Sequence, residues 1–285
     1  MRPLLTYQMA AALFCTSLLI LAAPASGAPQ RVVSLNPCLD VILVNVADRE
    51  QIAALSHYSR DKDTSTIAKI AETFPMTHES AEEVMALGPD LVLTSRHSDL
   101  ATRNALGRLN IKTELFSEPQ NVAESLEGVR RVASLVGQEA RGEEVVGRIQ
   151  AALAAAVSPL GAEPLPALIF QSNGFSSGRG TLVDELMTRT GFVNVADRYG
   201  LKWWSNVPLE HVIADPPAVL LAGEFRPDKP TWADRVLRHP ALRAIEPKMK
   251  IATFPDRLLF CGGPVLIESA AALARARRSA AGDTP

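Results

Sequence analysis

The chain has 285 residues, of which 47% are hydrophobic and 21% charged, and its formal net charge at pH 7 is -2. Because acidic and basic residues are nearly balanced, the composition offers no electrostatic footprint for nucleic acid and disfavours nucleic-acid binding. The length is enough for two α/β lobes, each with its own core, or for one larger α/β domain.

The N-terminus has the layout of a secretory signal peptide. Arg2 precedes an apolar run at Met9–Ala23, and small residues follow at 25–28. A membrane anchor is the competing interpretation, but a spanning helix needs about 20 apolar residues and this run is shorter. Cys15 has no small residue before it, which disfavours a lipid anchor. We expect a signal peptide at 1–27, cleavage near Gly27, and a soluble protein in the periplasm.

The first half of the chain alternates apolar strands with helical patterns. A polar, irregular stretch at His57–His78 interrupts them, and long loops of this kind are often functional. We expect strands at Arg31–Leu35, Gln51–Leu55 and Lys112–Phe116, and helices at Leu39–Val46, Leu100–Leu109 and Val122–Leu135.

One module occurs twice, 128 residues apart, at Glu82–Leu93 and at Glu210–Leu221. In each copy a helical apolar spacing ends at Gly-Pro or Pro-Pro, and a short apolar run typical of a buried strand follows. A solenoid would repeat every 20 to 50 residues or so. The wider separation indicates two similar α/β lobes with a cleft between them.

The sequence predicts one helix at Gln138–Val157, with a length of about 30 Å. We expect this helix to join the lobes and to allow only small movements between them. The predicted organisation is an N-terminal α/β lobe at 31–136, a linking helix at 138–158 and a C-terminal α/β lobe at 165–278. In the second lobe we expect strands at Ala167–Gln171, Lys250–Phe254 and Leu258–Phe260, a loop at Ser172–Gly180, and helices at Thr181–Thr190, Trp232–Leu237 and up to Arg278.

Taken together, these segments resemble the periplasmic substrate-binding proteins of ABC importers for vitamin B12 and iron-siderophores. The resemblance depends on the long helix, the two modules, and the segments Arg31–Asn36 and Gly180–Leu186. It implies two α/β lobes joined by one long rigid helix, with the ligand in the cleft between lobes. It also implies a monomer without a cofactor that captures cobalamin or an iron chelate.

In that family one glutamate on each lobe pairs with arginines of the membrane permease. By position in the repeated module, these glutamates correspond to Glu82 and Glu210. Two anionic side chains held apart by a rigid body would orient and steer docking on the ABC importer. The simpler interpretation is that both are solvated first-turn glutamates favoured by the helix dipole.

Large, flat, partly charged ligands are held by aromatic faces and arginines. Of the adjacent tryptophans, we expect one in the core and one facing the cleft. For the other candidate residues, an ordinary surface or packing role is the alternative to ligand contact. The predicted ligand-binding residues are Tyr58, Arg60, Arg96, Phe175, Trp203, Trp204 and Arg257, and His97 follows the first module's strand.

Cys38 and Cys261 are the cysteines that remain after processing, and each follows a predicted strand. An oxidising compartment permits a disulfide between them, but sequence cannot place two Cα atoms at bonding distance. The sequence leaves a disulfide and two independent buried thiols as alternatives.

Three other functions compete with the chelate binder. A bare zinc or manganese site needs several converging ligands, whereas the five histidines are scattered along the sequence. Haem is less easily excluded, because Tyr58 or a nearby histidine could serve as its axial ligand. An exported hydrolase using Cys261 or Ser34 has no Gly-x-Ser-x-Gly motif. The glycine-rich loop also lacks the lysine of a phosphate-binding P-loop.

Overall fold

The computed structural model describes residues 27–171, 174–223, 240 and 248–282. The predicted signal peptide, up to residue 26, and the predicted helix at Trp232–Leu237 lie outside the described residues. Within those ranges, no helix combines the length and the apolar character needed to cross a bilayer.

The N-terminal lobe is built on a five-stranded parallel sheet in the order β3-β2-β1-β4-β5. The central strands are buried on both faces, as expected when helices cover both sides of a parallel sheet. The strands are β1 Val32–Ser34, β2 Ile52–Ser56, β3 Met76–Thr77, β4 Leu91–Ser95 and β5 Thr113–Phe116. The helices are α1 Pro37–Val46, α2 Ala68–Ala71, α3 Ala81–Ala86, α4 Leu100–Arg108 and α5 Val122–Leu135, with 3-10 turns η1 Arg49–Gln51 and η2 His57–Arg60.

The C-terminal lobe has a four-stranded parallel sheet in the order β11-β10-β6-β8 and a separate two-stranded antiparallel sheet of β7 and β9. The strands are β6 Leu165–Phe170, β7 Phe175–Ser177, β8 Phe192–Asn194, β9 Trp204–Asn206, β10 Val219–Ala222 and β11 Lys250–Thr253. The other elements are α7 Leu182–Arg189, α8 Leu209–Ala214, α11 Val265–Ala281, η4 Ala196–Tyr199 and η5 Asp256–Leu258.

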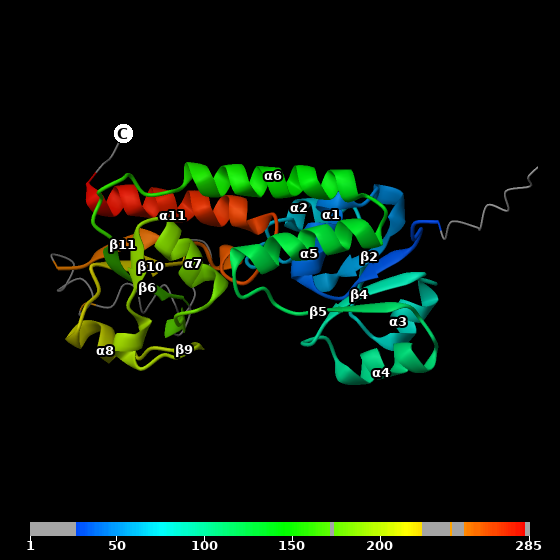
Figure 1. The fold of residues 1–285 in the computed structure, drawn as a ribbon. Coiled ribbons are helices and arrows are strands. Elements are labelled where there is room, and N and C mark those ends of the chain that lie inside the picture. The colour runs from blue at the N-terminus through cyan, green and yellow to red at the C-terminus, as the bar shows by residue number, and fades with distance from the viewer. Residues whose placement is uncertain (1–26, 172–173, 224–239, 241–247, 283–285) are drawn as a thin grey trace, which may run out of the picture.

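A long helix, α6 Glu139–Ala155, runs between the lobes along one side of the molecule (Figure 1). Its 17 residues span about 25 Å. It packs against α5, α11 and α1, and its buried stripe includes Val145, Ile149 and Leu153. The fold class predicted from the sequence, two α/β lobes with a long helix between them, is confirmed.

The largest apolar core is shared by both lobes. It contains Leu91 from the N-terminal sheet, Ile169 from the C-terminal sheet, and side chains of the helices between them such as Ile149 and Leu273. Each lobe also has a small core of its own, around Leu106 in one lobe and around Val212, Leu220 and Phe170 in the other. The lobes are therefore joined by continuous apolar packing as well as by α6.

Both copies of the repeated module form a short helix followed by a buried strand, α3 with β4 and α8 with β10, as predicted. The predicted strand at Leu258–Phe260 is wrong. After Pro255 the chain forms the 3-10 turn η5 instead of an extended strand, and it then leads into α11. The short strands β3, β7, β8 and β9 were not predicted, because two or three residues carry too little periodicity to identify a strand.

Candidate functional site

A cavity of about 270 Å³ opens in the N-terminal lobe where four parallel strands end. Residues that follow β1, β2, β3 and β4 border it, namely Asn36, Tyr58, Glu79 and His97. Ligands of open α/β sheets bind at the carboxyl ends of the strands. We call this cavity with its lining the N-terminal wall of the candidate site.

Tyr58 borders the cavity and belongs to the turn η2, which hydrogen bonds to Asp40 hold in place. The buried carboxylate of Asp40 accepts hydrogen bonds from the Ser56 amide (3.0 Å), the Ser56 hydroxyl (2.6 Å) and the Ser59 hydroxyl (2.6 Å). These bonds fix η2, and Tyr58 itself is 51% exposed. Burial raises the pKa of Asp40 to about 7, although the serine hydrogen bonds oppose the shift. Asp40 is thus a positioning residue beneath the predicted ligand-binding tyrosine.

The His57 imidazole lies against this tyrosine, and two further imidazoles lie near the same cavity or stack on His57. The rings of His57 and Tyr58 lie 3.9 Å apart, and those of His57 and His78 are stacked at 4.9 Å. His97, at the same cavity, lies 3.1 Å from Glu118. No sequence spacing groups these histidines, because 20 residues separate the stacked pair.

Glu79 is an acid that sequence inspection missed. Its backbone has a positive φ of 70°, which is uncommon outside glycine. Its Oε1 is buried and makes no hydrogen bond within the part of the chain that the structure describes. Burial raises the pKa of Glu79 to about 7. A strained residue with an unsatisfied oxygen at a cavity is typical of a functional position.

The C-terminal lobe offers a different surface, made of three aromatic rings. Phe175 on β7 stacks on Trp204 on β9 with ring centroids 5.5 Å apart, and Phe260 lies 5.9 Å from Phe175 and 6.1 Å from Trp204. Phe260 is 53% exposed. We call these three residues the aromatic wall. Trp204 is partly buried and packs against the shared core, whereas its neighbour Trp203 is 48% exposed. Which of the two contacts a ligand stays a prediction.

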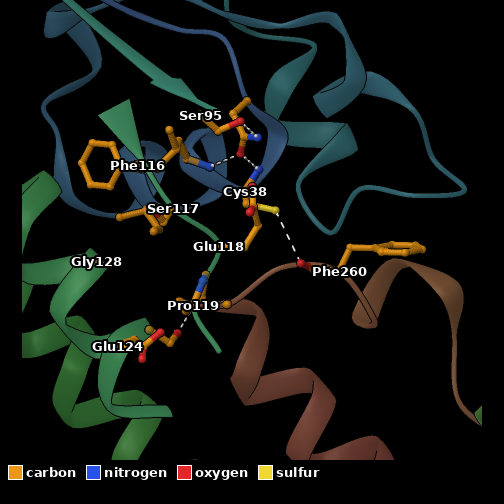
Figure 2. A pocket seen from close by; sticks show the side chains of 15 residues that line it. Cys38, Ser95, Phe116, Ser117, Glu118, Pro119, Glu124, Gly128 and Phe260 are labelled. Atoms are coloured by element: carbon orange, nitrogen blue, oxygen red, sulfur yellow. Dashed lines mark hydrogen bonds between the residues drawn. The ribbon is translucent and has the colours of Figure 1, made fainter. Parts of the chain in front are cut away.

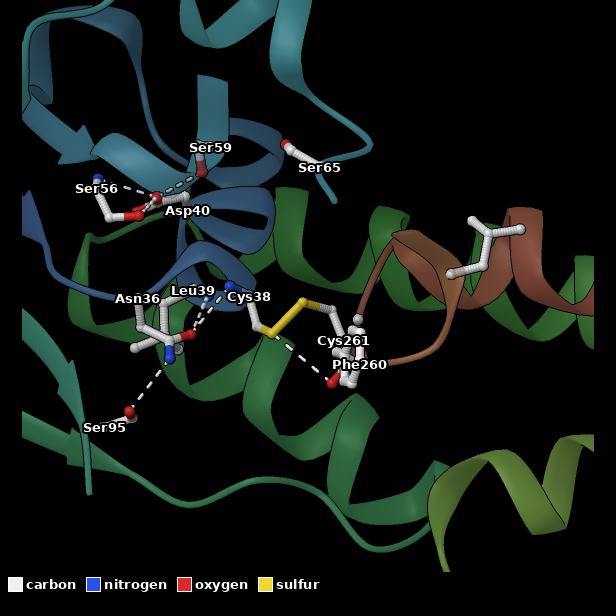
Figure 3. Close-up of a disulfide and its surroundings, with 12 residues drawn as sticks. Asn36, Cys38, Leu39, Asp40, Ser56, Ser59, Ser65, Ser95, Phe260 and Cys261 are labelled. Carbon is white, nitrogen blue, oxygen red and sulfur yellow. Dashed lines mark hydrogen bonds between the residues drawn. A yellow bond between two sulfur atoms is a disulfide. The ribbon is translucent and has the colours of Figure 1, made fainter. Parts of the chain in front are cut away.

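A disulfide between Cys38 and Cys261 joins the lobes (Figure 3), with Cα atoms 5.1 Å apart. Cys38 lies in the first turn of α1, which Asn36 caps by accepting hydrogen bonds from two backbone amides. A smaller cavity of about 70 Å³ lies beside the bond. Figure 2 shows that side chains of both lobes border it, among them Glu118 and Phe260. The structure thus contains the disulfide that the sequence left open.

The arginines of the predicted ligand set are dispersed. The guanidinium of Arg60 donates to the carbonyls of Ala71 (3.3 Å) and Phe74 (2.6 Å), so it holds the chain around α2 rather than reaching out for a ligand. Arg96 is exposed and donates to the Ser117 hydroxyl at 3.2 Å. Arg257 lies half-buried in η5. We therefore leave Arg60 out of the candidate site.

The predicted docking glutamates are both exposed in the first turns of short helices, Glu82 in α3 and Glu210 in α8. These helices lie at opposite ends of the molecule, on the side away from α6 (Figure 1). Their role in docking stays a prediction.

Among the described residues, no group of three or more His, Cys, Asp or Glu side chains is arranged to hold a metal ion. What the two walls provide is a phenol with imidazoles and a buried acid on one lobe, and an apolar aromatic surface on the other. Neither Glu79 nor Phe260 was predicted as part of a site: Glu79 directly follows the polar stretch His57–His78, and Phe260 was assigned to a strand that the structure does not contain.

Solved structures with the same fold are numerous. The chain matches the periplasmic heme-binding protein RhuT from Roseiflexus sp. RS-1 with a TM-score of 0.73 and 23% identity, covering 88% of this chain and 99% of that one. It matches the heme-binding protein HutB of Vibrio cholerae with a TM-score of 0.70 and 17% identity, covering 90% and 99%. For the vitamin B12-binding protein BtuF of Vibrio cholerae the TM-score is 0.66 and the identity 15%, covering 89% and 98%.

At these identities the similarities show the fold alone. No curated protein matches the sequence. A family model, described as "Periplasmic binding protein", matches residues 32–247, which include both walls except for Phe260. The extent of that match shows that the chain belongs to the periplasmic binding protein family.

Proposed function

We propose that this protein captures a metal tetrapyrrole, either haem or a corrinoid, and delivers it to an ABC importer in the inner membrane. The observation that carries the proposal is the pairing of the aromatic wall with a cavity that presents Tyr58. An apolar ring system can lie against Phe175, Trp204 and Phe260 while its metal or polar edge faces the other lobe. The same-fold proteins for heme and vitamin B12 support this cargo class.

Within the class, Tyr58 favours haem. A phenol oxygen is a known axial ligand of ferric haem, and a half-exposed tyrosine beside the His57 imidazole is accessible to one. A corrinoid brings its own ligands to cobalt and makes no such demand. Ferric siderophores have less support, since Arg60 is engaged within its own lobe.

As a member of a binding-protein family, the protein would hold the chelate as cargo rather than as a resident cofactor, and it would make or break no covalent bond. The proposed location is the periplasm, after removal of the signal peptide near Gly27. Mass spectrometry of the exported protein tests this step. An exported protein that still begins at Met1 would contradict removal of the signal peptide.

Titration of the mature protein with haemin, cyanocobalamin and a panel of ferric siderophores tests the cargo. Tryptophan fluorescence reports on Trp203 and Trp204, and calorimetry checks it because these ligands absorb the emission. We expect saturable one-to-one binding of a tetrapyrrole with a Kd below about 1 μM, near -8 kcal/mol. Absence of saturable binding to either tetrapyrrole would overturn the proposal.

Delivery is tested separately, through Glu82 and Glu210. Replacing both by alanine should leave cargo affinity unchanged and abolish uptake in cells, because the exposed pair would orient docking on the permease. A matched control replaces two exposed glutamates elsewhere, Glu50 and Glu144, and should transport normally. Normal uptake by the first variant would remove the docking role.

A further inference from the structure

The disulfide connects the two halves of the candidate site almost directly. Cys38 stands two residues after Asn36, which lines the N-terminal wall, and Cys261 follows Phe260 of the aromatic wall (Figure 3). The bonded cysteines are 223 residues apart in sequence. Because the bond links the two walls, neither wall can move far relative to the other without straining it.

The chain next to Cys261 is seated tightly on the N-terminal lobe. A Cβ at Gly262 would come within 2.5 Å of the Ser125 hydroxyl, and a Cβ at Gly263 within 2.8 Å of Ile42. The amide of Gly263 donates to that Ser125 hydroxyl at 2.6 Å. Only glycine allows this approach, and Gly263 also has a φ of 62°. The turn that carries Phe260 thus rests on α1 and α5.

A second polar contact crosses between the lobes nearby. The amide of Val122, at the start of α5, donates to the carboxylate of Glu185 on α7 at 2.7 Å. Together with the shared apolar core, this contact closes the side of the molecule behind the cleft. In the part of the chain that the structure describes, the disulfide is a covalent link between the lobes next to both walls, whereas α6 runs between the lobes along one side of the molecule (Figure 1).

We propose that Cys38 and Cys261 are a positioning pair, whose bond sets the spacing of the N-terminal wall and the aromatic wall and thereby the affinity for cargo. The kind of cargo rests on the function proposed above, whereas the control of wall spacing does not. With the bond intact the site is preformed, so binding orders less of the protein. Without it, Phe260 and its turn are held by non-covalent contacts alone, and the bound state loses part of its preorganisation.

The first test compares the native protein with the double variant Cys38→Ser, Cys261→Ser. We expect at least a tenfold weaker Kd for haemin or cyanocobalamin, mostly through faster dissociation, as measured by stopped-flow and calorimetry. The control variant Leu106→Ala removes apolar volume from the small core of the N-terminal lobe, away from the bond. It should lower thermal stability but keep the native Kd, which separates loss of positioning from loss of stability.

The second test needs no cargo. Spin labels attached by chemistry that spares cysteine, at exposed Arg108 in one lobe and Lys202 in the other, report the distribution of distances between lobes. We expect one narrow distribution in the native protein and a broader one in the serine variant. If the native protein binds no tetrapyrrole but the serine variant still has the broader distance distribution, the proposed function is overturned and the positioning role is supported.

Should the serine variant fail to fold, the native protein reduced in place supplies the same comparison. A dithiol such as dithiothreitol gives two electrons and two protons to the bond, which becomes two thiols, and leaves as a cyclic disulfide. Removing the reductant under air should restore the native Kd and distance distribution. An unchanged Kd and an unchanged distribution, in the variant or in the reduced protein, would overturn the proposal.

Discussion

The two long sides of this molecule differ in how their side chains are packed and exposed. Behind the cleft, α5, α6 and α11 share one apolar core with both sheets. At the cleft, Phe260 and Tyr58 are about half exposed and Glu79 keeps a buried oxygen without a partner in the described chain. Stability is therefore concentrated behind the cleft, and the incomplete contacts in front are those a ligand can complete. Substitutions on the two sides should have separable effects.

The largest effect is expected from Ile149→Ala, which empties a fully buried position of α6. Loss of the transfer free energy plus a cavity should lower the free energy of unfolding by about 2–5 kcal/mol. Urea denaturation measures it, with Val157→Ala as control because that side chain, beyond the end of α6, is exposed. A loss below about 1 kcal/mol would mean that the shared core is less important than its burial indicates.

Asp40 lies between the two sides and should make stability depend on pH. Burial raises its pKa from 3.8 to about 7, so the folded state binds more protons than the unfolded state in this range. The free energy of unfolding should therefore fall as the pH rises from about 4 to about 7. Glu79, with its pKa also raised by burial, adds to the same slope.

The variant Asp40→Asn removes one titrating group while its amide can still bond with Ser56 and Ser59. Urea denaturation at several pH values should show a smaller slope for this variant than for the native protein. Glu79→Gln should remove a further part. A slope identical to the native one in both variants would contradict the assignment.

Tyr58→Phe acts on the cleft alone. Because the side chain is 51% exposed, the free energy of unfolding should stay within about 0.5 kcal/mol of the native value. Removal of the phenol oxygen should weaken haemin binding more than tenfold and alter its visible absorption spectrum, whereas cyanocobalamin binding should not change. Native haemin spectra in the variant would show that Tyr58 is not the axial ligand.

The smallest effect is expected for Phe260→Ala, which removes one ring of the aromatic wall. Aromatic pairs contribute about 0.5–1.5 kcal/mol beyond area burial, so tetrapyrrole affinity should fall by roughly two- to tenfold. Leu160→Ala, a fully exposed position away from the cleft, is the matched control in calorimetry. Equal affinities for the two variants would take Phe260 out of the site.

Most of the fold could be predicted from local pattern. Helices such as α5 and α6 were identified within two or three residues, because their apolar spacing and end signals act within a few turns. Local pattern also explains the wrongly predicted strand at Leu258–Phe260. Three apolar residues in a row are compatible with a strand, but a strand forms only where a neighbouring strand can pair with them.

The site was predictable in part. Tyr58, Phe175 and Trp204 were identified by residue type and loop position, and the structure places them on the two walls. Glu79 and Phe260 were not predicted for the candidate site, and Arg60 donates to carbonyls of its own lobe. The sequence of a loop does not tell which way a side chain points, and Phe260 had been assigned to a strand that does not form.

By itself the sequence determined the α/β class, the duplicated helix and strand module, the long helix between the lobes and the presence of two cysteines that could pair. Only the tertiary structure decided that Cys38 and Cys261 meet, that His57 stacks on His78, and that Phe260 completes an aromatic wall. Secondary structure is encoded by neighbours in the chain. The contact between Cys38 and Cys261 depends on how the two lobes pack together, and the ring contacts within each lobe depend on how its loops fold back on one another.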